Sequence, residues 1–196
     1  LSHMMKVSFY PGCTLKTKAR NLEESTVASM AKLGVEPTDA TAERIPQLAG
    51  LLADVPPPRL FEEVVKLFLT GHGMRSLEAL QRFGLSRTLF PALPQGSGKG
   101  KIRIDTVLRK TLENTDHRVK TGLPVTPAFL FAALLWQPVK EQSEKLMAAG
   151  ETPYMAIMNA SEGVIAAQCV RTAVPRRFSA VTRQIWSMQA RFSKTR

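Results

Sequence analysis

Residues 124–136 read PVTPAFLFAALLW, and this stretch decides the class of fold. Thr126 is followed by Pro127, which is the order of a hydroxyl N-cap and a proline at the first helical position. The stretch therefore predicts an apolar helix that runs to Trp136, where Pro138 interrupts it. Thr152-Pro153 repeats the signal and predicts a second helix over 154–172.

The helical pattern extends outward from these two segments, from Thr41 to the end of the chain. Further helices are predicted over 21–32, 42–52, 59–70, 76–83, 105–120, 139–149 and from Pro175 onward. Residues 5–15 alternate weakly and indicate a short strand and a turn. The predicted fold is all-α, a multi-helix array with a short strand in the N-terminal leader.

Positive charge gathers in the second half of the chain. Residues 1–98 hold 11 basic and 9 acidic side chains, whereas residues 99–196 hold 16 and 7. An anionic partner is therefore expected on the C-terminal half.

Cysteine content and hydropathy exclude several classes of protein. The two cysteines, Cys13 and Cys169, can supply neither a disulfide framework nor four metal ligands. The longest apolar run, nine residues, is about half of a membrane span. With no export leader recognised, we expect a cytoplasmic protein without membrane contact. Residues 1–4 resemble a cloning scar ahead of a start at Met5.

The C-terminal helix carries the clearest functional pattern. From residue 171 onward there is no acidic residue, and the seven basic residues are Arg171, Arg176, Arg177, Arg183, Arg191, Lys194 and Arg196. At 100° per residue, Arg183 and Lys194 fall within about 20° of Arg176, and Arg191 within about 60°. The apolar residues on the opposite side are Phe178, Val181, Ile185, Met188 and Phe192. We expect this apolar side to pack on the core and the arginines to contact nucleic-acid phosphates, with Trp186 alone free to stack on a base.

Residues 95–103 contain GSGKGK and invite comparison with a phosphate-binding loop. That motif requires Ser or Thr after its lysine and a preceding strand, and here Ile102 follows Lys101. We expect a flexible loop, in which Lys99, Lys101 and Arg103 act as mobile charges toward a nucleic acid.

Residue types for catalysis are scarce. Apart from the scar, His72 and His117 are the only histidines, and the chain has no Asp-x-Asp pair for two-metal phosphoryl transfer. His72 stands between two glycines at a helix end, where a capping role is expected. We predict no catalytic residue, no metal site and no cofactor in this chain.

A set of short segments is spread in order along the chain: Thr41–Pro46, Val55–Val64, Thr70–Gly73, Leu89–Pro91, Asn114–Asp116, Pro124–Trp136, Val174–Arg177 and Gln184–Trp186. These segments resemble the bacterial poly(A) polymerase branch of the class II tRNA nucleotidyltransferase family. In this family a catalytic head is followed by a helical neck and a helical body that holds RNA.

The resemblance implies a neck-and-body region. Glu43 and Arg44 look like the neck element that fixes the nucleotide-selecting helix. The head motifs are missing, so the resemblance implies RNA binding here, and adenylyl transfer with ATP and Mg²⁺ in the intact enzyme of mRNA polyadenylation and decay. The expected divisions are a leader (5–36), a neck-like region (37–94), the loop (95–103) and a body (104–196).

Residues 6–16 resemble the start of a heterodisulfide reductase B-type subunit. That family binds iron–sulfur clusters through Cys-Cys-Gly sequences, which this chain lacks. Three alternatives to RNA binding stay open: a helical scaffold for an acidic protein partner, retained adenylyl transfer, and an iron–sulfur redox fragment. The sequence leaves the oligomeric state unknown.

Overall fold

A computed structural model describes residues 6–7, 36–37, 43, 45, 47 and 49–192 of the chain. Residues 49–192 form an all-α array, as predicted. Its helices are η1 (Ala49–Asp54), α4 (Pro57–Phe68), α5 (Gly73–Arg82), α6 (Ser86–Leu89), α7 (Thr106–Lys120), α8 (Pro127–Leu134), α9 (Trp136–Ala148), α10 (Pro153–Cys169) and α11 (Arg176–Phe192).

Two short strands precede the helices. β1 (Lys6–Val7) pairs in parallel with β2 (Glu36–Pro37), and Lys6 lies opposite Glu36. The short strand expected in the leader is therefore present. Glu43, Ile45 and Gln47 have helical conformation and lie within the predicted helix 42–52.

The threonine caps form as the sequence predicts. Thr126 accepts a hydrogen bond from the Phe129 amide at the start of α8, and Thr152 accepts one from Met155 at the start of α10. The break after α8 comes at Leu135, earlier than Pro138, which lies in the first turn of α9. Proline has no N–H, so the bond that α8 would need from residue 138 cannot form and the helix ends sooner.

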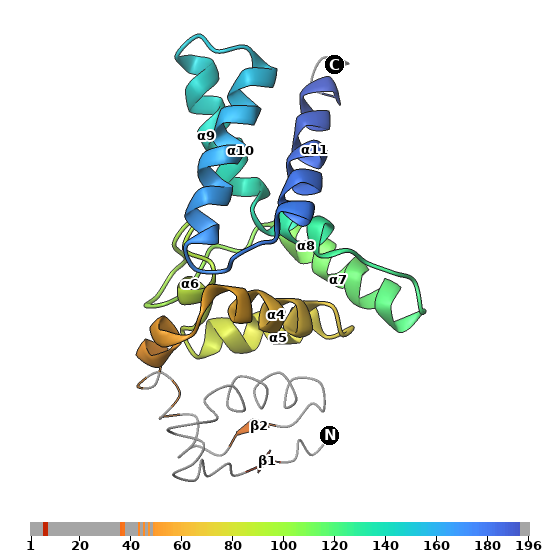
Figure 1. Cartoon of the computed structure of the whole chain (residues 1–196). Helices are drawn as coiled ribbons and strands as arrows, with labels where there is room; N and C mark the ends of the chain where they lie inside the picture. The colour runs from red at the N-terminus through yellow and green to blue at the C-terminus, as the bar shows by residue number, and fades with distance from the viewer. Residues whose placement is uncertain are drawn as a thin grey trace.

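The helices form two layers (Figure 1). α4 and α5 lie across the base, and α9, α10 and α11 stand on it, with α7 and α8 between. Phe61 of α4 joins the layers, because its ring stacks on Phe131 of α8 at 5.7 Å and on Phe178 of α11 at 5.9 Å. One hydrophobic core therefore runs through both layers.

Hydrogen bonds at the foot of α10 also join the layers. The buried Gln168 side chain donates to the Leu89 carbonyl at 2.7 Å. In the connection to α11, the Ala173 amide donates to the Pro57 carbonyl at 3.2 Å. These bonds attach the end of α10 to α6 and the connection before α11 to α4.

Residues 95–103, expected to be a flexible loop, form a hairpin. Gln95 and Ile102 make an antiparallel bridge. The Gln81 side chain of α5 clamps it by donating to the Ile102 carbonyl at 2.6 Å and accepting from the Ile102 amide at 3.0 Å. The hairpin also contacts the α5–α6 corner so closely that a Cβ on Gly100 would lie 2.1 Å from the Gly84 carbonyl oxygen.

The N-terminus of α5 is capped by a residue far along the chain. Asp116 of α7, which is 9% exposed, accepts hydrogen bonds from the Gly73 amide at 2.6 Å and the Met74 amide at 3.1 Å. His72, expected to cap this helix end, occupies the N-cap position without a side-chain cap bond. The carboxylate of Asp116 also suits the positive end of the helix dipole.

We predict that Asp116→Ala lowers the free energy of unfolding by about 1–3 kcal/mol, because two amides lose their acceptor in a buried place. Asp116→Asn, which keeps one oxygen, will lose less. Urea denaturation measures both values. A loss for Asp116→Ala no greater than that for Asp105→Ala, which removes an ordinary N-cap of α7, would contradict the assigned role.

No helix in the described ranges is long and apolar enough to cross a lipid bilayer.

Candidate nucleic-acid interface

Helix α11 packs on α8 through a mixed polar and aromatic face. The Thr182 hydroxyl donates to the Ala128 carbonyl at 3.0 Å, and the Trp186 indole N–H donates to the Ala132 carbonyl at 2.9 Å. Ser179 and Ala190 are buried on the same side of the helix. The spacing of these four residues, three or four apart, makes them one continuous stripe.

This contact face corrects the sequence prediction. Trp186, expected to be free for stacking, is 1% exposed, whereas Val181 and Met188, expected to be buried, are 43% and 46% exposed. The helix is therefore rotated from the predicted orientation. α8 explains the difference: it is apolar on every side, so it offers no preferred apolar stripe, and its small Ala128 and Ala132 let Thr182 and Trp186 reach backbone carbonyls.

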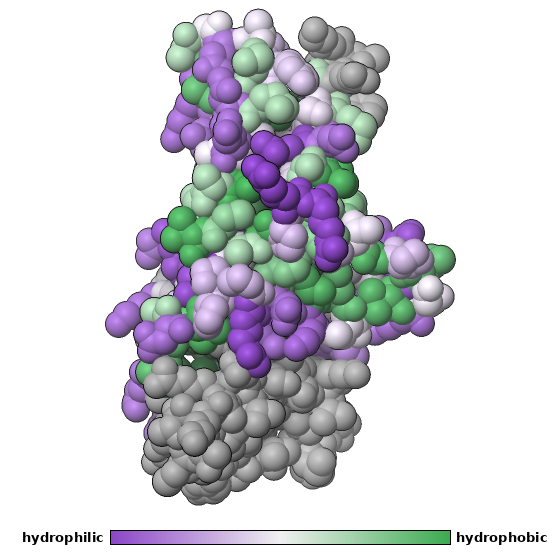
Figure 2. Space-filling model, viewed as in Figure 1, coloured by the Kyte–Doolittle hydropathy of each residue, from purple (hydrophilic) through white to green (hydrophobic). Residues whose placement is uncertain are grey.

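The arginines of α11 nevertheless face outward. Arg176 and Arg177 are exposed and Arg183 is half-buried. Within residues 49–192, none of the three forms an ion pair with a carboxylate. The Arg177 guanidinium lies over the Phe178 ring, with its Cζ 4.8 Å from the centroid. Figure 2 shows strongly hydrophilic residues beside apolar ones over this part of the molecule.

Arg171 differs from the α11 arginines in its surroundings. It lies before the helix and is half-buried, and its Nη1 donates to the Ala53 carbonyl at 3.4 Å. This contact directs the side chain toward η1, so Arg171 helps to join the layers.

The three basic residues of the hairpin differ in their exposure and in their contacts. Lys99 is exposed and Lys101 is half-buried. Arg103, expected to be a mobile charge, pairs with Glu141 of α9. A hydrogen bond from Gln137, together with the hydrogen bond and charge of Arg103, lowers the pKa of Glu141 below its ordinary value. Arg103 is therefore held against α9.

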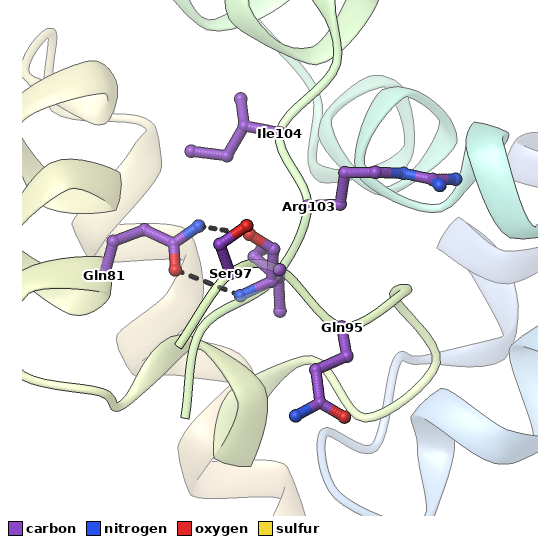
Figure 3. Close-up of a pocket in the computed structure, with 7 residues that line it drawn as sticks. Gln81, Gln95, Ser97, Arg103 and Ile104 are labelled. Atoms are coloured by element: carbon purple, nitrogen blue, oxygen red, sulfur yellow. Dashed lines mark hydrogen bonds between the residues drawn. The ribbon is translucent and has the colours of Figure 1, made fainter. Parts of the chain in front are cut away.

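An open hollow of about 430 Å³ lies between α5 and the hairpin (Figure 3). Gln81, Gln95, Ser97, Arg103 and Ile104 line it. The Gln81 carboxamide already bonds to the hairpin backbone, and Arg103 is paired. The hollow thus has little charge left to bind an anion, and α11 is the better candidate interface.

Arg191 lies in the last turn of α11 by its backbone. Arg44, Lys194 and Arg196 lie outside the described residues. Glu43 of the neck motif is exposed.

Exposed basic residues that the sequence did not single out lie on other helices as well. They include Arg109, Lys110 and Lys120 on α7, Arg59 on α4 and Arg75 on α5. Acidic residues are interspersed among these basic residues in the sequence. Only the structure shows that these basic side chains lie on exposed faces of their helices. A helical array that presents arginines without carboxylate partners on one helix defines a class of basic modules suited to polyanions.

Comparisons with known proteins place the chain within this class. Residues 34–95 match the family described as the "probable RNA and SrmB-binding site of polymerase A", and residues 149–196 match the "polymerase A arginine-rich C-terminus". The chain is 38% identical over 166 residues, 84% of its length, to poly(A) polymerase I of Salmonella typhi. It is 36% identical over 171 residues, 86% of its length, to the enzyme of the same name from Haemophilus influenzae.

The chain belongs to the bacterial poly(A) polymerase family, as its sequence motifs predicted. It spans 36% of the length of the Salmonella relative and 38% of the Haemophilus one. It is therefore similar to about a third of those proteins, the RNA-binding and arginine-rich part.

Proposed function

We propose that this chain holds RNA for a bacterial poly(A) polymerase, and that Arg176, Arg177 and Arg183 of α11 contact the phosphate backbone. The observation that carries the proposal is the absence, within residues 49–192, of a carboxylate partner for these three guanidiniums. A guanidinium matches two phosphate oxygens with parallel hydrogen bonds, and these three need break no ion pair with a described carboxylate to do so. Lys99 on the hairpin, and Arg191, Lys194 and Arg196 near the end of the sequence, would add further phosphate contacts.

The polymerase activity of the intact enzyme is a separate proposal. This sequence contains no Asp-x-Asp pair. Adenylyl transfer to RNA, with ATP and Mg²⁺ as in the resembling family, would accordingly need residues outside this chain. With labelled ATP, Mg²⁺ and an RNA primer, we expect no extension by this chain alone. We also propose a cytoplasmic location, where such RNA would be met.

A second candidate function is a protein-binding role for the neck. The family description that matches residues 34–95 names SrmB beside RNA, which supports a protein partner for this segment. Exposed cations of this segment include Arg59 on α4 and Arg75 on α5. The two roles would use different layers of the molecule.

The test is a salt titration of RNA binding by the whole chain. Fluorescence anisotropy with a labelled single-stranded oligoribonucleotide, from about 50 to 400 mM salt, gives the slope of log K against log salt. Three phosphate contacts predict that log K falls with log salt with a slope of about −2 or steeper, because each contact with a single strand contributes about −0.7. Affinity that does not change with salt would refute phosphate binding. Binding to an acidic protein with no binding to RNA would favour the scaffold alternative.

A further inference from the structure

Four exposed side chains form a row on the solvent face of α11. Arg177, Val181, Gln184 and Met188 follow one another at intervals of four, three and four residues, so they lie along one side of the helix. All four are exposed. The row spans about 17 Å, at 1.5 Å per residue. We call these four residues the outer row.

The outer row combines apolar surface with free positive charge. Isolated exposed apolar residues are common on proteins, so Val181 or Met188 alone would mean little. Here, however, α11 buries Ser179 and Thr182 and leaves Val181 and Met188 in solvent. Arg177 begins the row, and Arg176 and Arg183 lie on the flank of the same helix, without carboxylate partners among the described residues.

We infer that the outer row contacts the unpaired bases of a single-stranded RNA, while Arg176, Arg177 and Arg183 contact its phosphates. This inference rests on the proposed function and adds the residues of α11 that would contact the bases. A single strand exposes both a charged backbone and the apolar faces of its bases, which matches the two chemistries of α11. In an A-form duplex the bases are stacked inside and the surface consists largely of phosphates and 2′-hydroxyls, so Val181 and Met188 would gain nothing.

The side chains of the outer row also indicate which base sequences of RNA it binds. Met188 has a flexible, polarisable thioether that adapts to different partners, and the row holds no aromatic ring. Gln184 is the only side chain of the outer row that can both donate a hydrogen bond to a base and accept one from it. We therefore expect tolerance of base sequence together with preference for unpaired strands.

A protein helix is the competing occupant. Amphipathic helices usually dock in an apolar groove. The outer row is one residue wide, and the hollow found in the described part of the chain lies at the hairpin. Net charge also favours RNA, since residues 171–196 contain no acidic residue.

The test compares single-stranded and duplex RNA of the same sequence. The variant is Val181→Ser with Met188→Ser, which removes the apolar contacts and keeps every charge. The control is Val107→Ser with Met155→Ser, a Val and Met pair on α7 and α10 that is 50% and 48% exposed. Both variants change solvent-exposed positions, and circular dichroism verifies that each keeps its helix content.

We expect the α11 variant to bind the single strand about fivefold to tenfold more weakly, with its duplex affinity and salt slope unchanged. The control is expected to match the unsubstituted chain. Unchanged single-strand affinity, or an equal loss on both RNAs, would overturn the inference. So would an α11 variant that keeps its RNA affinity but no longer binds an acidic amphipathic peptide. Failure of the unsubstituted chain to bind any RNA would instead refute the proposed function.

Discussion

The Gly100→Ala variant will be less stable than the unsubstituted chain by about 2–4 kcal/mol. Gly100 has φ +73°, and an added Cβ would lie 2.1 Å from the Gly84 carbonyl oxygen and 2.8 Å from its Cα. The left-handed backbone contributes about 1 kcal/mol of this loss, and the forced separation of two backbones contributes the rest. The hairpin must move away, which weakens the hydrogen bonds that the Gly100 carbonyl accepts from the Arg87 amide and the Ser86 hydroxyl. Thermal unfolding should show a drop in Tm of roughly 5–15 °C.

Gly122→Ala is a matched control for this effect. Gly122 has φ +75°, nearly the same as Gly100, and no atom lies within 4 Å of the position of its Cβ. It should lose only the backbone contribution, about 1 kcal/mol. An equal loss of unfolding free energy at the two glycines would show that the close approach of the hairpin to Gly84 does not contribute to the destabilisation.

Replacing Arg176, Arg177 and Arg183 together by Gln is expected to lower RNA affinity about 100-fold at 0.1 M salt. Each phosphate contact contributes about 0.7 to the slope of log K against log salt, and therefore about 0.7 decade at this concentration. The slope itself should fall in magnitude by about 2. Anisotropy titrations at several salt concentrations measure both quantities, and the loss should be similar for RNAs of different sequence, because phosphates carry no base information.

The control for charge alone is Arg109→Gln, Lys110→Gln and Lys120→Gln. These three residues are exposed on α7, so the variant loses the same formal charge from another helix. A loss of affinity equal to that of the α11 variant would mean that RNA responds to net charge and not to the arginines of α11.

The starts of α8 and α10 were predictable from the sequence because their causes are local. Thr126-Pro127 and Thr152-Pro153 place a hydroxyl and a fixed φ at adjacent positions, and both helices begin there. The outward position of Arg176 and Arg177 was also predictable, since a buried guanidinium needs a partner and no acidic residue follows Glu162.

The contact face of α11 was not predictable, because it depends on the neighbouring helix. The apolar residues of α11 indicated one side, but Thr182 and Trp186 make specific hydrogen bonds to α8 carbonyls on another. A periodicity argument ranks faces by hydrophobicity and contains no information about backbone acceptors on a partner 54 residues away.

The hairpin was missed for a similar reason. A segment rich in glycine and lysine is typical of a linker, and the residue that orders it, Gln81, lies 21 residues from Ile102. Asp116 caps α5 across 43 residues, measured from Gly73. Long-range hydrogen bonds of this kind have no local sequence signal.

The joint at the foot of α10 has a mechanical consequence. Gln168 attaches the end of α10 to α6, and Arg171 and Ala173 attach the connection before α11 to η1 and α4. Under the proposed function, a pull on an RNA strand held by α11 would therefore act through these bonds on the neighbouring layer as well.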